Sequence, residues 1–210
     1  MPDAGSPGVP DLLHVDDALI VVHKPSGLLA VQGRVEPDCL AARMQVIYPD
    51  ALVVHRLDQA TSGLMVFARG KANERALSKQ FQARNVTKRY EALVAGHLDT
   101  VEGHIDLPVG ADWPRRPRQQ LDAVHGKASL TLWQLLEYRQ VDDTTRLALT
   151  PVTGRTHQLR VHLQAIGHPI VGDALYGGRA AHRLMLHACH LGLQHPVTLQ
   201  ALQWDCPAPF

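Results

Sequence analysis

Apolar positions along the chain occur in short runs separated by turn-forming residues. Short apolar or alternating runs are typical of β-strands, and apolar residues three or four apart indicate helices. We therefore expect strands at 18–23, 52–54, 64–68, 88–96, 128–136, 146–150, 184–190 and 198–202, with a short extended piece at 28–31. Helices are expected at 40–47, at 71–84, and from Gly154 to Gly167, where a glycine followed by a proline two residues later ends the helix.

The predicted strands outnumber the helices and do not alternate with them in the regular order of a parallel sheet. This pattern favours an α+β fold around a mixed, largely antiparallel sheet flanked by helices and loops. Residues 1–10 are rich in Gly and Pro and are expected to be a disordered tail. Residues 97–126 are expected to be a loop, and residues 11–210 to form a single domain.

The composition is that of an ordinary globular protein. Of 210 residues, 45% are hydrophobic and 20% are charged, which argues against disorder and against collagen-like or coiled-coil architectures. The three cysteines are too few and too scattered for a disulfide framework, so we expect a reducing, cytoplasmic location. No apolar run approaches the roughly 20 residues that cross a bilayer, and the first residues lack the pattern of a signal peptide.

The formal net charge of +1 argues at first against a nucleic-acid partner, but the charges are unevenly distributed. Residues 1–50 are acidic, whereas 69–90 carry seven basic side chains and one acidic one. Lys71, Arg75 and Lys79 recur every four residues on a predicted helix, a like-charged stripe that weakens an isolated helix.

A second basic cluster contains Arg115, Arg116 and Arg118, interspersed with two prolines. Positive charge gathered without acidic partners fits phosphate binding. A solvated surface is the alternative interpretation of both clusters.

Several common chemistries lack their sequence signatures. His157 and His162 lie five apart on a predicted helix and therefore point to different faces. His182, His187 and His190 lie in strand-like sequence without Cys, Asp or Glu at a metal-binding spacing, so we expect no metal site. The G-x-S-x-G pattern of hydrolases and the glycine-rich phosphate-binding patterns are absent, which argues against the commonest nucleotide-dependent enzymes.

Asp58 is the strongest candidate for chemistry. It follows an apolar stretch at the end of a predicted strand, two residues after Arg56. A nearby cation keeps a partly desolvated carboxylate ionised, and such a carboxylate can act as a nucleophile. Considered alone, an aspartate in this position more often caps the following turn. Arg155 and Arg160 project about 140° apart on the predicted helix, so one could meet a carboxylate while the other reaches a phosphate.

Several sequence blocks together resemble the RluA-type pseudouridine synthases. HRLDQATSG at 55–63 is similar to the family motif HRLDxxTSG. Further matches are DDALIVVHKPSG at 16–27, KRYEALVAG at 88–96, TPVTGRTHQLRVH at 150–162 and GHPIVGDALYG at 167–177. His23 departs from the pattern, because the family usually has Asn there. The blocks keep their order over about residues 12–205, so the resemblance implies the pseudouridine-synthase fold for nearly the whole chain.

The resemblance implies a role for individual side chains. Asp58 would be the catalytic aspartate, and Arg160 would pair with it. Tyr90 would stack on the target base, Arg155 would bind substrate, and Arg56 would enter the RNA stack that the flipped base has left. The RNA backbone would be met by a larger basic set: Lys71, Arg75, Lys79, Arg84, Lys88, Arg115, Arg116 and Arg118.

The family reaction breaks the uridine C1′–N1 bond, rotates the uracil and rejoins it through C5, without a metal or cofactor. Asp58 could attack C1′, assist a glycal route or add to C6. The segment DWPRRPRQ at 112–119 is similar to that of dual-specificity members, which implies a tRNA anticodon stem-loop and a 23S rRNA hairpin as partners. We also expect a monomer without membrane contact. Because only about a dozen residues precede the first block, we expect no S4-type RNA-binding domain.

Two other classes of function are weighed against this one. A non-catalytic RNA-binding module, or an inactive synthase, would not need to keep Asp58, Tyr90 and Arg160 together. A glycoside-type hydrolase would need a second acid near Asp58, and the motif contains none.

Overall fold

The structure, a computed structural model, describes residues 10–210, so residues 1–9 of the tail predicted at 1–10 lie outside the described residues. The chain divides into two compact units. The first contains the chain up to Val86 together with Gly192–Trp204, and the second contains Thr87–Leu191 with Asp205–Phe210. The single domain predicted for 11–210 stays a prediction.

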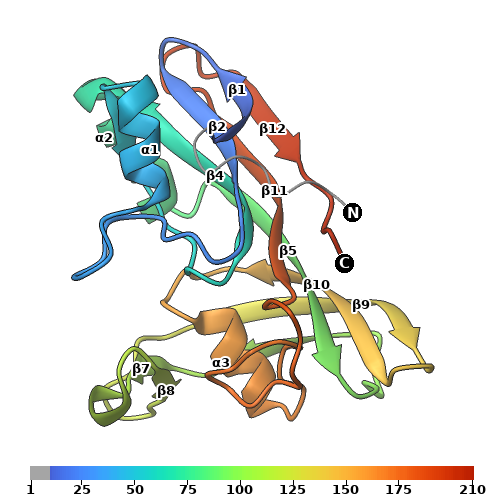
Figure 1. The fold of residues 1–210 in the computed structure, drawn as a ribbon. Coiled ribbons are helices and arrows are strands. Elements are labelled where there is room, and N and C mark those ends of the chain that lie inside the picture. Colours follow the sequence, from blue (N-terminus) through green and yellow to red (C-terminus); the bar gives the residue numbers. More distant parts are fainter. Residues whose placement is uncertain (1–9) are drawn as a thin grey trace. The chain divides into compact units, whose positions relative to one another are not determined.

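The first unit combines antiparallel strands with two helices (Figure 1). Its elements are β1 (Asp11–Val15), β2 (Leu19–Lys24), α1 (Leu40–Ile47), β3 (Ala51–Val53), β4 (Ser62–Arg69), α2 (Gly70–Gln82) and most of β12 (Ala201–Asp205). Strand β2 pairs with β1 and β4, and β3 also pairs with β4. Both helices pack against β3, and α2 also packs against β4. Strands β2 and β4 are buried almost throughout, which explains why their sequences are continuous apolar runs.

The second unit contains most of the remaining strands and one α-helix (Figure 1). Its elements are β5 (Thr87–Ala95), β6 (Glu102–Asp106), β7 (Val109–Ala111), the 3₁₀ turn η1 (Trp113–Arg115), β8 (Gln119–Leu121), β9 (Leu130–Arg139), β10 (Thr144–Pro151), α3 (Gln158–Ala165) and the larger part of β11 (Leu186–Gln194). Antiparallel pairing links β5 to β10, β10 to β9, and β9 to β6. Strands β7 and β8 form a separate antiparallel pair, and α3 packs against β8.

The observed elements confirm the predicted mixture of helices and largely antiparallel strands. Helix α1 has the predicted bounds, and the other predicted strands and the helix at 71–84 differ by a few residues at their ends. No helix within residues 10–210 is both long and apolar enough to cross a membrane.

Two predictions about local structure are wrong, and one strand was not predicted. The segment 97–126 is not a loop, because it contains β6, η1 and the pair β7–β8, whose short polar strands leave little hydrophobic periodicity. Strand β1 was not predicted, because its exposed positions alternate with half-buried ones rather than with buried ones. Helix α3 begins at Gln158 and not at Gly154, because His157 before it adopts a left-handed conformation with φ of 54°. Ile166 therefore lies beyond the helix and is partly exposed, whereas Leu163 within the helix is buried.

Candidate active site

Asp58 lies in the irregular segment that connects β3 to β4 in the first unit. Leu57, immediately before it, is buried, whereas Arg56 is exposed and Asp58 is half-buried. The leucine therefore fixes this segment to the core, and the two charged side chains flank it where solvent has access.

The backbone directly after Asp58 is held by the turn at residues 24–27. The carbonyl oxygen of Gln59 accepts hydrogen bonds from the backbone N–H of Gly27 at 2.9 Å and from Lys24 Nζ at 3.0 Å. The side-chain amide of Gln59 donates in return to the carbonyl oxygen of Gly27 at 3.0 Å. Gly27 has a φ of +90°, a region that favours glycine, so the turn depends on this residue. These contacts fix the backbone position of the Asp58 loop.

Lys24 is fully buried, which is rare for a lysine and requires that its charge be solvated by the protein. Its Nζ also donates to the carbonyl oxygens of Pro25 at 2.9 Å and Leu28 at 2.7 Å. With Gln59, three carbonyl oxygens therefore occupy the three donors of the ammonium group. The Ser26 hydroxyl adds a further link to the same loop by donating to the carbonyl oxygen of Ala60 at 2.6 Å.

His55, the first residue of the HRLD sequence, fixes the other end of this loop. Its Nε2 accepts the backbone N–H of Val66 at 3.0 Å, and its ring stacks on Phe81 of α2 with the ring centroids 4.6 Å apart. Because Nε2 accepts, the proton of the neutral imidazole lies on Nδ1. The histidine therefore connects the loop to both β4 and α2.

Arg160, on α3 in the second unit, forms a buried ion pair with Asp173. Arg160 Nε and Nη2 each donate to one carboxylate oxygen at 2.8 Å, and the two side chains are 5% and 0% exposed. The carboxylate also accepts the backbone N–H groups of Leu175 and Tyr176. A bidentate pair of this kind sets the plane of the guanidinium group as well as its position. The pairing of Arg160 with Asp58 stays a prediction, and Asp173 is a partner that the sequence did not reveal.

His162, one turn from the N-terminus of α3, is fully buried and connects the helix to the strands beneath it. Its Nε2 lies 2.9 Å from the carbonyl oxygen of Leu107, and its Nδ1 lies 2.9 Å from the hydroxyl of Thr131. Since a carbonyl can only accept, Nε2 carries the proton and Nδ1 accepts from Thr131. Burial lowers the pKa of His162 below its ordinary value, although the Leu107 carbonyl and the Asp106 carboxylate oppose this shift.

Gln158 completes the buried network at the start of α3. Its side-chain N–H groups donate to the Thr131 hydroxyl and to the carbonyl oxygen of Leu130, both at 3.0 Å. Its side-chain oxygen accepts from the Thr153 hydroxyl at 2.8 Å and from the backbone N–H of Arg155 at 3.0 Å. Every hydrogen-bonding position of the amide is therefore occupied, so the orientation of α3 is fixed.

Tyr176 connects α3 to the loop before β8. Its side chain is almost completely buried, and its hydroxyl accepts the backbone N–H of Gln119 at 2.8 Å and lies 2.7 Å from Nδ1 of His157. The guanidinium carbons of Arg118 and Arg160 lie 5.4 Å and 5.0 Å from the centre of its ring, within the range of cation–π attraction. Tyr176 thus contacts both Arg160, which is predicted to bind substrate, and Arg118, which is predicted to contact the RNA backbone.

The other predicted substrate-binding residues of the second unit lie near the surface. Tyr90 is half-buried on β5, opposite Leu149 of β10. Arg155 lies before α3 and directs Nε and Nη2 toward the carbonyl oxygen of Ala128, at 3.4 and 3.3 Å. The first unit therefore holds Asp58 and Arg56, and the second holds Tyr90, Arg155 and Arg160.

The predicted RNA-backbone residues form two groups. Lys71, Arg75 and Lys79 are exposed along α2, and Arg84 follows the helix with a left-handed φ of 61°. Lys71 is partly neutralised, because its Nζ lies 3.0 Å from a carboxylate oxygen of Glu74. The predicted basic stripe therefore lies on the surface of the first unit.

The second basic group lies between β7 and β8, apart from Lys88, which is half-buried on β5. Arg115 and Arg116 are exposed and Arg118 is half-buried. Arg115 Nε binds the buried carboxylate of Asp112 at 2.7 Å, so the prediction that this cluster lacks an acidic partner is wrong for Arg115.

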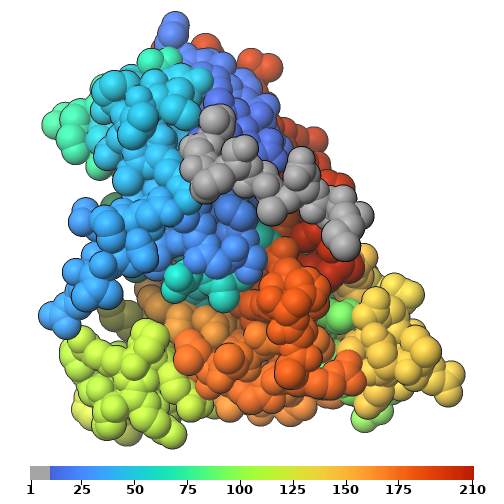
Figure 2. Space-filling model, viewed as in Figure 1, coloured from blue at the N-terminus to red at the C-terminus, as the bar shows by residue number. Residues whose placement is uncertain are grey.

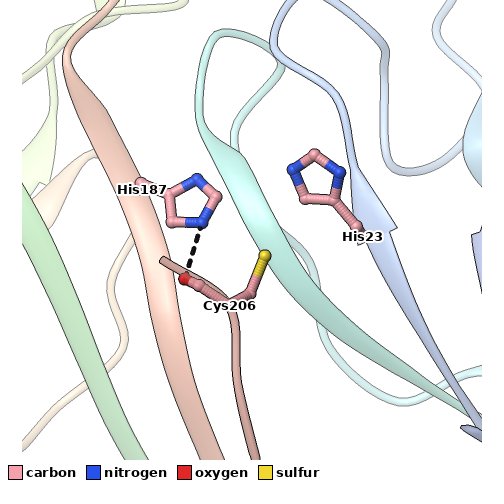
Figure 3. A group of neighbouring side chains, drawn as sticks. All are labelled: His23, His187 and Cys206. Carbon is pink, nitrogen blue, oxygen red and sulfur yellow. Dashed lines mark hydrogen bonds between the residues drawn. The ribbon is translucent and has the colours of Figure 1, made fainter. Parts of the chain in front are cut away.

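The histidines considered as metal ligands have partners of other kinds. Figure 3 shows His187 on β11 with its Nε2 3.1 Å from the carbonyl oxygen of Cys206, so that nitrogen carries a proton. His190 Nδ1 lies 2.8 Å from a carboxylate oxygen of Asp205, a partner distant in sequence that the prediction overlooked. His23, also drawn in Figure 3, belongs to the first unit, where its Nδ1 is 3.6 Å from Asp11.

Comparison with known proteins defines the class. Residues 18–165 match the family model for RNA pseudouridylate synthase, and this chain belongs to that family. It is therefore an RNA pseudouridine synthase, an isomerase, with the pseudouridine-synthase fold that the sequence motifs predicted.

Individual proteins of this family share high sequence identity with the chain. The chain is 47% identical over 205 residues to the dual-specificity RNA pseudouridine synthase RluA of Escherichia coli strain K12, an alignment that covers 95% of this chain and 93% of that protein. It is 50% identical over 195 residues to the Vibrio parahaemolyticus protein of the same name, covering 89% and 78%. Among solved structures, human RNA pseudouridylate synthase domain containing 1 superposes with a TM-score of 0.84 at 31% identity, covering 99% of this chain and 87% of that one.

Proposed function

We propose that this enzyme converts specific uridines to pseudouridine in two structured RNAs, a tRNA anticodon stem-loop and a 23S rRNA hairpin, with Asp58 as the catalytic residue. The observation that carries the proposal is the loop HRLDQATSG. It presents Asp58 beside an exposed Arg56, on a backbone held by hydrogen bonds to Lys24 and Gly27. A catalytic carboxylate needs such a fixed position, because small misplacements of a reacting group are costly in rate.

The proposed reaction starts with base flipping. The target uridine leaves the RNA stack at a cost of a few kcal/mol, and a planar guanidinium that enters the vacated space offsets part of that cost. Arg56 suits this role because it is exposed two residues before Asp58. Tyr90 would stack on the flipped base, and Arg155 and Arg160 would bind the substrate and support the charge of the aspartate.

In the chemical steps the C1′–N1 bond breaks, the uracil rotates, and a C1′–C5 bond forms. The proton lost from C5 is balanced by the proton gained at N1, so neither an oxidant nor an energy source is consumed. Attack at C1′, a glycal route and addition at C6 all need the ionised carboxylate of Asp58. The same substitution therefore tests all three routes.

The decisive experiment compares wild type with Asp58→Asn on synthetic stem-loops of both RNAs, with pseudouridine measured by mass spectrometry. We expect conversion by wild type and no detectable conversion by the variant. The control is Asp38→Asn, which removes an exposed carboxylate paired with Arg43 and should leave conversion intact. Conversion by Asp58→Asn, or none by wild type, would refute the assignment.

The dual specificity is tested in cells. Pseudouridine would be mapped across total RNA from a strain that lacks the gene, and again after complementation with wild type or with Asp58→Asn. We expect one site in tRNA and one in 23S rRNA to disappear and to return only with wild type. Loss of a pseudouridine in only one of the two RNAs would refute dual specificity and leave that RNA as the single substrate.

We further propose that the enzyme works as a cytoplasmic monomer without a cofactor. The buried free thiols of Cys39 and Cys189 support a reducing compartment. Sedimentation of the purified protein should give the mass of one 23.1 kDa chain, and a concentration-dependent dimer would contradict the proposal.

A further inference from the structure

An exposed tryptophan lies among the arginines between β7 and β8. Trp113 is 69% exposed, and the guanidinium carbon of Arg116 lies 3.7 Å above the centre of its ring. Residues 112–119 carry this stack together with Arg115 and Arg118, and we call them the Trp113 loop. In Figure 2 the hairpin that carries it, coloured yellow-green, lies at the protein surface.

The Trp113 loop has a fixed backbone. Three backbone hydrogen bonds of 3.0 to 3.1 Å close the loop. The N–H of Asp112 donates to the carbonyl oxygen of Arg118, the N–H of Arg115 to that of Asp112, and the N–H of Arg118 to that of Arg115. The buried carboxylate of Asp112 also holds Arg115. At the far end, the backbone N–H of Gln119 is bound by the hydroxyl of Tyr176. The exposed ring is therefore presented by a preorganised loop, which reduces the entropy cost of using it for binding.

The chemistry of the loop selects its partner. An indole ring with a cation on one face and most of its surface in water offers a flat apolar surface for a second flat ring. The surrounding positive charge favours an anionic molecule: Asp112 is already paired with Arg115, while Arg116 and Arg118 form no ion pair within the described residues. A flat ring attached to a phosphate chain is an unpaired nucleotide, and stacking on aromatic side chains is how proteins bind unpaired bases.

We propose that Trp113 is a stacking platform for an unpaired nucleobase of the RNA substrate, at a position other than the target uridine. The inference rests on the proposed function, because it assumes that structured RNA is the substrate. Tyr90 and Asp58 are assigned to the target base, so the platform binds a neighbouring loop nucleotide, while Arg116 and Arg118 face its phosphates. The platform contributes to affinity and to the choice of RNA rather than to the chemical step.

The first test measures binding of the two synthetic stem-loops to wild type, Trp113→Ala and Trp113→Phe. Loss of one base stack predicts a dissociation constant about tenfold higher for Trp113→Ala, with a similar rise in KM and a much smaller change in kcat. Trp113→Phe should recover most of the affinity. The matched control is Val124→Ala, because Val124 is an exposed apolar residue in the turn after β8. Thermal unfolding would verify that every variant is folded.

The second test distinguishes stacking from a structural role. Each unpaired loop nucleotide of the stem-loops would be replaced in turn by an abasic one. At one position, removal of the base should weaken binding to wild type but not to Trp113→Ala. Equal weakening of both proteins at every position, or unchanged affinity of Trp113→Ala, would overturn the platform. Trp113-dependent binding to anionic phosphatidylglycerol vesicles without Trp113-dependent RNA binding would instead assign the loop to a membrane surface and would also overturn it.

The outcomes separate this inference from the proposed function. If wild type forms pseudouridine and Trp113→Ala binds RNA normally, only the platform is wrong. If wild type binds the stem-loops through Trp113 but forms no pseudouridine in them, the substrate assignment is wrong and the platform holds. Failure of wild type to bind either stem-loop would overturn both.

Discussion

Helices α2 and α3 carry the same kinds of polar side chain and use them in opposite ways. In α2, Leu77 is the buried residue and the basic stripe faces solvent. In α3, six consecutive residues from Gln158 to Leu163 are buried, including an arginine, a histidine and a glutamine. Each of those three polar groups has partners at hydrogen-bonding distance. Helix α3 is therefore a positioning element whose side chains act as a unit, whereas the charges of α2 act separately and additively.

The largest expected effect comes from removing the carboxylate that holds Arg160. Asp173→Asn keeps the shape of the side chain but removes the charge that compensates a buried guanidinium. Breaking a buried pair costs about 3 to 5 kcal/mol of the free energy of unfolding, and the misplaced Arg160 should lower pseudouridine formation as well. Urea denaturation and the conversion assay measure the two effects.

The exposed pair between Asp38 and Arg43 is a matched control for this variant. It has the same bidentate geometry, with hydrogen bonds of 2.8 and 2.6 Å, but it lies at the surface. Asp38→Asn should therefore change stability far less than Asp173→Asn, because water replaces the lost partner. Equal unfolding midpoints of the two variants would show that the buried Arg160–Asp173 pair contributes no more to stability than the exposed one.

A smaller effect, with a characteristic pH dependence, is expected from His162. Its pKa is lowered by burial from an ordinary value of 6.5, so the unfolded state binds the proton more tightly than the folded state does. The stability contributed by neutral His162 is therefore present above about pH 6.5 and is lost as the pH falls below that value. Protonation also makes Nδ1 a donor, which disrupts its acceptance of the Thr131 hydroxyl.

The substitution His162→Gln removes this titration. At pH 7.5 it should lower the free energy of unfolding by about 1 to 3 kcal/mol, because Leu107 and Thr131 lose a buried partner. The difference from wild type should narrow as the pH falls to 5, since wild type alone loses the contribution of neutral His162. Urea denaturation at several pH values measures this difference. A constant or widening gap would show that His162 is not the titrating group.

The sequence predicted the elements and the site residues to different extents. Helix α1 was predicted with its observed bounds, because a local pattern of apolar spacing followed by Pro49 determines it. The position of Asp58 between two strands was predicted for the same reason. The partner of Arg160 was not, because Asp173 lies thirteen residues away and the pairing depends on how the chain turns back after α3.

The motif blocks contain further residues whose contacts the sequence predicts only in part. Asp173 and Tyr176 both lie in the block GDALYG, but neither residue type has a role that spacing alone reveals. Gln158 and His162 lie four residues apart, so helix geometry alone predicts that they share one face of α3. Their partner Thr131 lies on β9, and strand-to-helix contacts of this kind arise from tertiary packing that a single sequence does not encode locally.

The smallest effect on stability is expected on α2, where the effect on RNA binding should be visible instead. Arg75→Gln removes an exposed charge that forms no ion pair among the described residues, so the free energy of unfolding should change by less than about 0.5 kcal/mol. If Arg75 contacts a phosphate, the slope of log affinity against log salt should fall by about 0.7 to 0.9. Lys71→Gln is the internal comparison, and it should change the slope less because Glu74 already offsets part of its charge. A large loss of stability in Arg75→Gln would show that α2 also positions its charges through packing, and the contrast with α3 would then fail.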